Sequence, residues 1–314
     1  MKLLVLREGV HGTNASAYAD LLRDRLPDHE VVHARTREAE LREIRDARVA
    51  TGIDIDTELL ERAGRLRLFA GAYAGHSHLP LDALDERNVA VTNAVGVHAP
   101  NVAEYVLGAL LARVRSFREG YRRQERAEWR PFEVGELAGS TVTVVGLGAI
   151  GSAVVERLNP FEVETVGIRA NPEQGGPADT VHGPDGFHDA LARSDAVVLA
   201  CPLTEETRGL VDEPEFTTMP TEAHLVNVAR GPVVDTDALV TAIRRNVIGG
   251  ATLDVTDPEP LPADHPLWGF ENVQVTPHNA GATPAYYDRL ADILAENVEH
   301  AAAEGFEELR NQVA

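Results

Sequence analysis

The chain has 314 residues, and three things that it lacks restrict what it can be. A single cysteine, Cys201, excludes an internal disulfide and with it a small secreted framework held by disulfides. The sequence has no apolar run of about eighteen residues, the length that predicts a membrane-spanning helix. The apolar stretch 3–6 is too short for a signal peptide. We therefore expect a cytoplasmic protein that does not enter a membrane.

Basic charge, and lysine above all, is also scarce. Of the 29 basic residues only Lys2 is a lysine, and 50 acidic residues bring the formal net charge to −21. This balance leaves no broad basic surface for phosphates, so we expect no nucleic-acid partner. The acidity fits either an ordinary protein kept soluble by charge repulsion or one adapted to molar salt. We favour the second, since arginine so strongly replaces lysine, although a GC-rich genome also favours arginine.

What the chain does contain is enough apolar surface for a packed core, 44% of its residues, and a length that favours two domains. Short apolar runs alternate with helical patterns over the first ninety or so residues. This alternation predicts a parallel sheet covered by helices on both faces. The expected strands are 31–32, 47–50, 66–70 and 89–92, and the expected helices are 18–26, 38–43, 57–62 and 81–87.

A second alternation begins at residue 141, after the longest helical pattern of the chain at 100–126. Pro100 suits a first helical position and Glu104 the first turn. A last helix at 284–304 lies too late for the second sheet and is expected to return to the first domain. The expected strands of the second sheet are 141–145, 165–168, 196–200, 224–227, 250–254 and 273–276.

These patterns predict two doubly wound α/β domains with parallel sheets, Rossmann-like or flavodoxin-like, and a cleft between them. The substrate domain is expected to be discontinuous, with residues 1–97 and 285–314. The dinucleotide-binding domain is expected over 98–284. The crossover segments 97–100 and 282–285 are the expected hinges for closure.

The strongest local signal is the turn Gly146-Leu147-Gly148-Ala149-Ile150-Gly151, which follows a predicted strand and opens a predicted helix at 152–158. That context is the one the dinucleotide fingerprint requires. The first glycine permits the tight turn, the second lets the backbone approach the pyrophosphate, and the third allows close packing. The alternative is a glycine-rich turn without a ligand, but the flanking strand and helix favour a dinucleotide.

Arg169 stands where the fingerprint predicts an acidic residue for the ribose 2′-hydroxyl group. A carboxylate there would repel a 2′-phosphate, whereas a guanidinium binds it through charge-assisted hydrogen bonds. The sequence therefore predicts a preference for NADP(H), with NAD(H) as the second possibility. The alternative is a solvated surface arginine.

Three further residues follow predicted strands of the second sheet, namely Arg230, Glu259 and His278. Ligands bind beyond the carboxyl ends of such strands, so these side chains are expected to converge. Reduction of a keto carbon needs a proton donor, a role that suits His278 with Glu259 favouring its imidazolium form. Arg230 suits a substrate carboxylate and the adjacent carbonyl group. Taken alone, each of these residues is also explained as a solvated surface or loop residue without a catalytic role.

With these segments together, the chain resembles the D-isomer-specific 2-hydroxyacid dehydrogenase family over nearly its whole length. The glycine turn, Asn227-Val228-Ala229-Arg230-Gly231, the segment from Asp254 to Glu259-Pro260, and Pro277-His278 occur in the family's order. The resemblance implies Arg230, Glu259 and His278 as catalytic residues. It also implies a homodimer whose interface includes the long helix after Pro100. Cofactor contacts are implied by it at Ala149, Ile150, Cys201, Pro202, Thr207, Val228, Ala229 and Asp254. The other predicted cofactor residues are Gly146, Gly148, Gly151, Arg169, Ala170 and Gly281.

The resemblance also implies that a loop of the first domain binds the substrate carboxylate through backbone N–H groups of Gly75 and His76. Here the sequence departs from the family, which more often has a small apolar residue and an aspartate at His76 and Ser77. His76 and His78 either alter substrate choice or face solvent, and two histidines are weak evidence for a metal, so none is expected. Trp268 is expected to contact the substrate side chain or to lie in the core.

The resulting prediction is an enzyme that reversibly reduces a small 2-keto acid to the (R)-2-hydroxy acid with NADPH. A nucleotide-sensing co-regulator of the same fold is the alternative outside the enzymes, and the complete Arg–Glu–His set argues against it. A formate or phosphoglycerate dehydrogenase relative is the alternative among enzymes. The sequence does not name the keto acid.

The salt interpretation predicts that the melting temperature rises with KCl concentration. At about 1 M salt the Debye length falls to about 3 Å, which screens most of the repulsion within a chain of charge −21. Thermal unfolding followed by circular dichroism between about 0.1 M and about 2 M KCl measures this effect. A melting temperature that stays constant or falls would contradict adaptation to salt.

Overall fold

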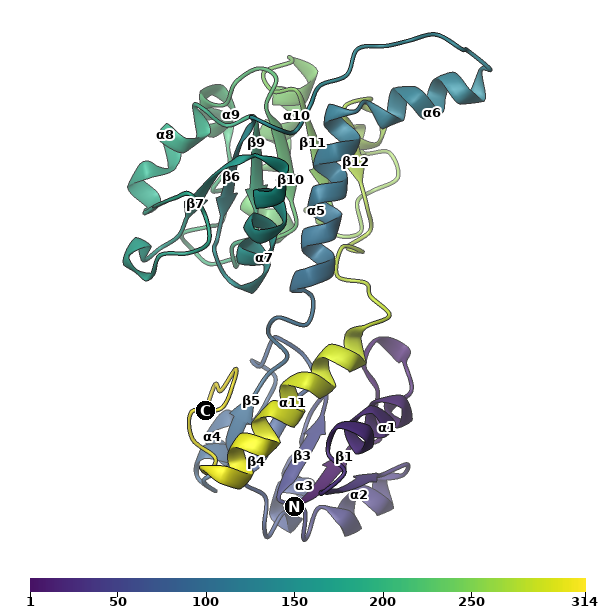
Figure 1. Ribbon diagram of the computed structural model, residues 1–314, viewed down its shortest axis with the longest axis vertical. Coiled ribbons are helices and arrows are strands. Elements are labelled where there is room, and N and C mark those ends of the chain that lie inside the picture. Colours follow the sequence, from purple (N-terminus) through teal and green to yellow (C-terminus); the bar gives the residue numbers. More distant parts are fainter. The chain divides into compact units, whose positions relative to one another are not determined.

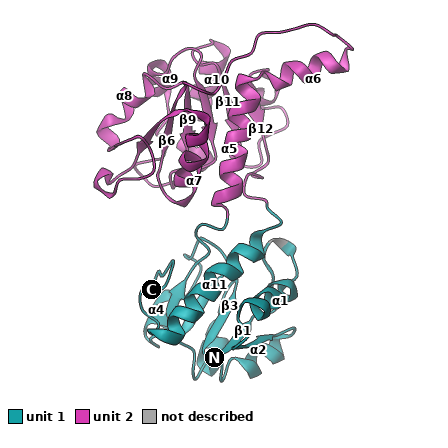
Figure 2. Ribbon diagram, in the orientation of Figure 1, with its two compact units in different colours: residues 1–97, 283–314 teal, residues 98–282 magenta. Residues whose placement is uncertain are grey.

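The computed structural model describes residues 1–314, apart from the side chain of His11. The chain forms two compact units, shown in teal and magenta in Figure 2. The first unit contains Met1–Val97 and Thr283–Ala314, and the second contains His98–Ala282. Each unit is an α/β structure built on one parallel sheet, as the alternation of strands and helices predicted.

The sheet of the first unit has five parallel strands in the order β2-β1-β3-β4-β5. Three helices of this unit, those that begin after Asn14, Thr36 and Asp56, have a side-chain cap at the N-terminus. The Asp56 carboxylate, for example, accepts a hydrogen bond from the N–H of Leu59. The strands are β1 (Lys2–Val5), β2 (Glu30–His33), β3 (Val49–Gly52), β4 (Leu68–Gly71) and β5 (Ala90–Thr92). The helices are α1 (Ala15–Arg25), α2 (Arg37–Glu43), α3 (Thr57–Arg62), α4 (Leu81–Asp85) and α11 (Tyr286–Ala303).

The last helix of the chain, α11, supplies part of the core of the first unit. Its buried residues Tyr286, Leu290, Leu294 and Val298 recur every four positions and so form one face. This face shares a hydrophobic cluster with residues of β1 and α1, and α11 lies beside α1 in Figure 1. The unit is therefore completed only by chain that follows the second unit in sequence.

The second unit has seven parallel strands in the order β12-β11-β10-β9-β6-β7-β8. The order reverses at β6, because β7 follows on one side and β9 on the other, and such a switch point is where sheets of this type bind ligands. The strands are β6 (Thr141–Val145), β7 (Glu164–Ile168), β8 (Thr180–His182), β9 (Ala196–Leu199), β10 (His224–Asn227), β11 (Gly250–Leu253) and β12 (Val273–Val275). The helices are α5 (Ala99–Val114), α6 (Phe117–Glu125), α7 (Ala149–Leu158), α8 (Phe187–Leu191), α9 (Glu213–Thr218) and α10 (Thr236–Arg244).

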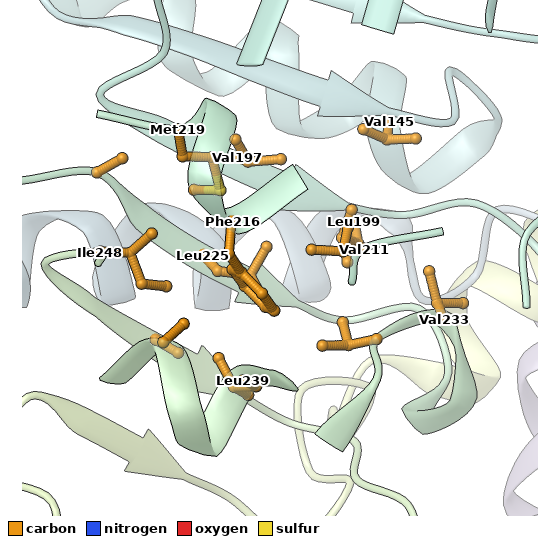
Figure 3. Close-up of a cluster of buried hydrophobic side chains, with 14 of the residues drawn as sticks. Val145, Val197, Leu199, Val211, Phe216, Met219, Leu225, Val233, Leu239 and Ile248 are labelled. Carbon is orange, nitrogen blue, oxygen red and sulfur yellow. The ribbon is translucent and has the colours of Figure 1, made fainter. Parts of the chain in front are cut away.

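Helices cover both faces of this second sheet. On one face, Phe216 of α9 and Leu239 of α10 pack against strand residues such as Leu225 (Figure 3). On the other face, α5 lies against α7, and Val106 and Val154 belong to their shared core. The four strands β6, β9, β10 and β11 are thus buried along nearly their whole length, as a parallel sheet requires.

The long helix predicted over 100–126 is wrong, because α5 and α6 are separate helices. Ser116 between them has a left-handed backbone with φ 51°. The carbonyl oxygen of Val114 accepts a hydrogen bond of 2.7 Å from the N–H of Gly135, and Ser116 Oγ donates to the carbonyl of Glu133. A segment that returns from later in the sequence therefore satisfies the end of α5, and no local pattern predicts it.

Three smaller differences concern the ends of elements. The helix α5 begins at Ala99, so Pro100 occupies the second helical position, and Glu104 lies beyond the first turn. The edge strand β8 was not predicted, because it is short and none of its residues is fully buried. Among the described residues, no helix is both long and apolar enough to cross a membrane.

Candidate active site

The glycine turn after β6 gives its three glycines three different environments. Gly146 has φ +94°, and a Cβ atom there would lie 2.6 Å from the Cα atom of Cys201, so both conformation and space require glycine. A Cβ atom on Gly151 would lie 1.9 Å from the carbonyl oxygen of Gly146. Gly148, in contrast, faces open space, with no atom within 4 Å of an added Cβ. The turn thus packs tightly at both ends and is open at its middle glycine.

Helix α7 begins at this open glycine. Gly148 is its N-cap residue and has no side chain with which to cap the helix. The first backbone N–H groups of α7 therefore remain available for an anion, and the helix dipole favours negative charge there. Leu147, between the first two glycines, is buried and packs beneath Gly167 and Gly176. These residues fit the pyrophosphate of a dinucleotide.

Arg169 directly follows β7, and its guanidinium group is held by the next loop. Nη1 donates a hydrogen bond of 2.6 Å to the carbonyl of Gly175, and Nη2 donates to Oε1 of Gln174. Gly175 turns this loop with φ +61°. An arginine has five N–H donors, so these two hydrogen bonds orient the group and leave further donors for an anion. The loop therefore presents an oriented cation near the glycine turn.

Arg230 lies on a loop that follows β10 and is organised by Asn227. The buried amide of Asn227 donates from Nδ2 to the carbonyl of Arg230 and accepts from the N–H of Ala229. The next residue, Gly231, contacts the backbone of Thr256, since an added Cβ would lie 2.0 Å from that carbonyl oxygen. The loop of Arg230 and the loop after β11 therefore pack directly on each other.

Glu259 and His278 lie within hydrogen-bonding distance of each other on adjacent loops of the same unit. His278 Nδ1 and Glu259 Oε2 are 3.2 Å apart, and Glu259 Oε1 accepts a hydrogen bond from the N–H of Thr256. His278 has a left-handed backbone with φ 52°. Both side chains are about half exposed, so the second imidazole nitrogen can face a ligand. This pair can hold and deliver a proton.

Asp254, predicted as a cofactor contact, has its carboxylate engaged within the protein. Oδ1 accepts from Thr276 Oγ1 at 2.6 Å and from the N–H of Asn279 at 2.8 Å, and Oδ2 accepts from the N–H of Ala280 at 2.9 Å. Its carbonyl oxygen also accepts from the N–H of His278. The residue is only 3% exposed. Asp254 thus anchors the loop that carries His278, a role that sequence reasoning missed.

Other predicted cofactor positions line the same edge of the sheet. Cys201 follows β9 and is buried, and burial raises the pKa of its thiol, which suits a neutral lining residue. Thr207 Oγ1 donates to the carbonyl of Pro202 at 2.6 Å. Val228 and Ala229 are buried beyond β10. Their roles toward a ligand stay predictions, as do those of Ala149, Ile150, Ala170 and Gly281.

The predicted substrate loop lies in the first unit, directly after β4. Gly75 faces open space, and the ring of His76 is partly buried with its Nδ1 atom unpaired. His78 Nε2 lies 2.9 Å from the carbonyl of Ile53, and its ring meets Tyr73 edge-on. Across the described residues, no three metal-ligating side chains gather in a metal-like cluster.

Trp268 is about half exposed in the second unit, and its indole Nε1 donates to the carbonyl of Pro262. It lines a groove of about 850 Å³ together with Phe117 and Tyr121. The structure thus brings Glu259, His278 and Asp254 into contact, with the loop of Arg230 packed beside them. The groove that Trp268 lines contains none of these residues.

Comparisons with known proteins show which family the chain resembles. Residues 107–280 match the family model "D-isomer specific 2-hydroxyacid dehydrogenase, NAD binding domain". A glyoxylate reductase of Thermofilum pendens is 38% identical over 275 residues, which cover 84% of this chain and 80% of that protein. The human glyoxylate reductase/hydroxypyruvate reductase is 33% identical, over 78% of this chain and 76% of that protein.

A similar solved structure is that of a D-isomer specific 2-hydroxyacid dehydrogenase from Xanthobacter autotrophicus in complex with NADPH and MES. It superposes with a TM-score of 0.77 and 31% identity, covering 99% of this chain and 98% of that one. A member of the same family from Lactobacillus delbrueckii, in its NAD complexed form, has a TM-score of 0.82 at 23% identity and supports the fold.

The glycine turn predicts different outcomes for two substitutions. Gly148→Val should keep the melting temperature but weaken NADPH binding about tenfold or more, because the side chain fills the approach to the backbone. Gly151→Ala should lower the melting temperature, because its Cβ would overlap the carbonyl of Gly146. Thermal unfolding and fluorescence titration with NADPH measure both effects. Equal NADPH affinity in Gly148→Val and the wild type would contradict a dinucleotide at this turn.

Proposed function

This chain belongs to the D-isomer specific 2-hydroxyacid dehydrogenase family, and on that premise we propose how its residues reduce a 2-keto acid. The observation that carries the proposal is the contact of His278 Nδ1 with Glu259 Oε2, 3.2 Å apart, on loops that follow strands of the sheet that carries the glycine turn. The reaction is reversible: a 2-keto acid, NADPH and a proton give the 2-hydroxy acid and NADP⁺. The (R) configuration of the product is part of the proposal.

The dinucleotide, when bound, supplies the hydride that the keto carbon accepts. The residues that hold it are the open backbone at Gly148, the first N–H groups of α7, and Arg169. The remaining work falls to the chain's own acids and bases. Hydride addition leaves negative charge on the former carbonyl oxygen, so that oxygen must receive a proton.

His278 is the proposed proton donor. Its Nδ1 atom is engaged by Glu259, which leaves Nε2 to face the substrate oxygen. The carboxylate of Glu259 stabilises the charged imidazolium before transfer and fixes the ring orientation. Arg230 is proposed to bind the substrate carboxylate and to polarise the carbonyl group beside it. In the oxidation direction His278 takes the proton back.

The two units are proposed to divide the ligands. The second unit holds the dinucleotide, and the backbone N–H groups of Gly75 and His76 in the first unit hold the substrate carboxylate. Gly75 supports this role because its backbone is open to a ligand. Residues 97–100 and 282–285, where the chain passes from one unit to the other, are proposed as hinges. Trp268 stays a proposed contact to the substrate side chain.

The substrate is proposed to be a small 2-keto acid, since relatives include glyoxylate reductases. Purified protein should turn over at least one of glyoxylate, pyruvate, hydroxypyruvate and branched 2-keto acids with NADPH, followed at 340 nm. His278→Ala should lower kcat about 100-fold or more, the range for a general acid, and change NADPH binding little. Wild-type turnover in this variant would refute the mechanism. Inactivity of the wild type on every acid would favour a nucleotide-sensing co-regulator.

Arg169 carries the proposed preference for NADPH over NADH. Its guanidinium is oriented by Gly175 and Gln174 and retains donors for a 2′-phosphate. The wild type should therefore show a higher kcat/KM with NADPH. Arg169→Asp should reverse the ratio of the two kcat/KM values, because a carboxylate repels the phosphate and accepts from a 2′-hydroxyl group. An unchanged ratio in the variant would exclude Arg169 as the determinant.

The protein is proposed to be a homodimer that uses the segment 113–134. This segment projects from the second unit as α6 and the loop that follows it (Figure 1). It exposes Phe117, Tyr121 and Trp129, the last fully. Residues 113–130 hold seven arginines against three glutamates in a chain of net charge −21. An aromatic, basic arm on an acidic protein fits the acidic surface of a second copy.

Sedimentation analysis should give a dimer mass for the wild type. Tyr121→Ser with Trp129→Ser should shift the protein toward monomer, because the substitutions remove the arm's exposed aromatic surface. Phe161→Ser, which removes an exposed aromatic residue outside the arm, serves as the control and should stay dimeric. A monomeric wild type, or a dimeric double variant, would contradict the proposed interface.

A further inference from the structure

One face of α5 is hydrogen-bonded to the segment 276–282. Asn101 Nδ2 donates to the carbonyl of Ala280 at 2.7 Å, and the hydroxyl group of Tyr105 lies 2.6 Å from Thr276 Oγ1. The two helix residues are four positions apart and therefore share a face. This face joins α5 to a segment far from it in sequence, and that segment contains the proposed proton donor.

The direction of the Tyr105 hydrogen bond follows from counting hydrogens. A threonine hydroxyl group has one hydrogen, and Thr276 Oγ1 donates it to Oδ1 of Asp254 at 2.6 Å. Thr276 must therefore accept from Tyr105. Burial and the charge of Asp254 raise the pKa of Tyr105 to about 12, so its phenol keeps its hydrogen at neutral pH. The result is a relay from α5 through two hydroxyl groups to a buried carboxylate.

The end of this relay is the anchor of the His278 loop. The carboxylate of Asp254 accepts from the N–H groups of Asn279 and Ala280, and its carbonyl accepts from the N–H of His278. A carboxylate in the protein interior needs every donor it has, because desolvation of its charge is expensive. Whatever orients the carboxylate therefore also orients the backbone on which His278 stands.

We propose that Tyr105 is a positioning residue for the reaction, which acts on His278 through Thr276 and Asp254. The proposal rests on the role proposed above for His278. Hydrogen bonds in a chain polarise and strengthen one another, so the phenol makes Thr276 a better donor to Asp254. Without it the anchor bond weakens, and His278 spends less time in register with Glu259. Binding of the dinucleotide at Gly148 and Arg169 is unaffected.

Tyr105→Phe tests the proposal, because it removes one oxygen and keeps the ring, which packs against the core that α5 shares with α7. The kcat should fall about fivefold, the equivalent of one hydrogen bond, with KM for the keto acid and for NADPH within about twofold. Amide hydrogen exchange at residues 278–280 should accelerate by a similar factor in the ligand-free protein. The matched control is Tyr18→Phe, which removes a phenol 3.5 Å from Thr51 Oγ1 in the first unit. It should change neither measurement.

Two substitutions at Thr276 separate a relay from simple packing. Thr276→Ser keeps the hydroxyl group and should retain kcat close to the wild type. Thr276→Val interrupts the relay, so adding Tyr105→Phe to it should lower kcat no further, a non-additive pair. A packing role for Tyr105 would instead give independent effects that multiply.

The proposal is overturned if Tyr105→Phe leaves amide exchange at 278–280 unchanged, or if its effect multiplies with that of Thr276→Val. It is equally overturned if KM for NADPH rises as much as kcat falls. A wild type that reduces no 2-keto acid refutes the proposed role of His278. In that case the amide exchange rates of Tyr105→Phe, Thr276→Val and the double variant still decide whether Tyr105 holds the loop.

Discussion

The burial of one carboxylate, that of Asp254, is the constraint on which the site depends. A carboxylate that leaves water loses several kcal/mol of solvation, so the protein must surround it with donors. Those donors are a threonine hydroxyl and two backbone N–H groups of the loop 276–280. The loop is consequently held in one conformation, in which His278 takes a left-handed backbone and meets Glu259. The hydrogen bonds that the buried carboxylate of Asp254 requires thus fix the position of His278.

Parallel strand order explains why these groups meet at all. Strands β6, β9, β10 and β11 are neighbours, and each ends in a loop that carries part of the site. In a parallel sheet all carboxyl ends lie at one edge, so the glycine turn, Cys201, Arg230 and Asp254 are collected there without special contacts. Side chains in these loops then refine the arrangement, as Asn227 does for the loop of Arg230.

Charge acts on two scales in this protein. The net charge of −21 sets a negative field for the whole chain, whereas NADPH and a keto acid are both anions. In the proposed function, attraction comes from two local cations, Arg169 and Arg230, and from the N–H groups at the start of α7. Salt screens the distant acidic surface more than these short contacts. Adaptation of the acidic surface to salt stays a prediction, and ligand binding is proposed to depend on a few arginines.

The sequence by itself determined most of the elements and the family to which the chain belongs, because periodicity and motifs are local. The bounds predicted for β6, β10 and α3 agree with the structure, and Glu259 and His278 were paired from their motifs alone. Only the tertiary structure decided the break at Ser116, the place of Arg169 under its loop, and the anchoring role of Asp254. Each of these depends on hydrogen bonds between residues that are not neighbours in sequence. The N–H of Gly135 donates to the carbonyl of Val114, and the hydroxyl group of Thr276 donates to the carboxylate of Asp254. A local pattern states which groups can bond, and only packing brings one partner within reach.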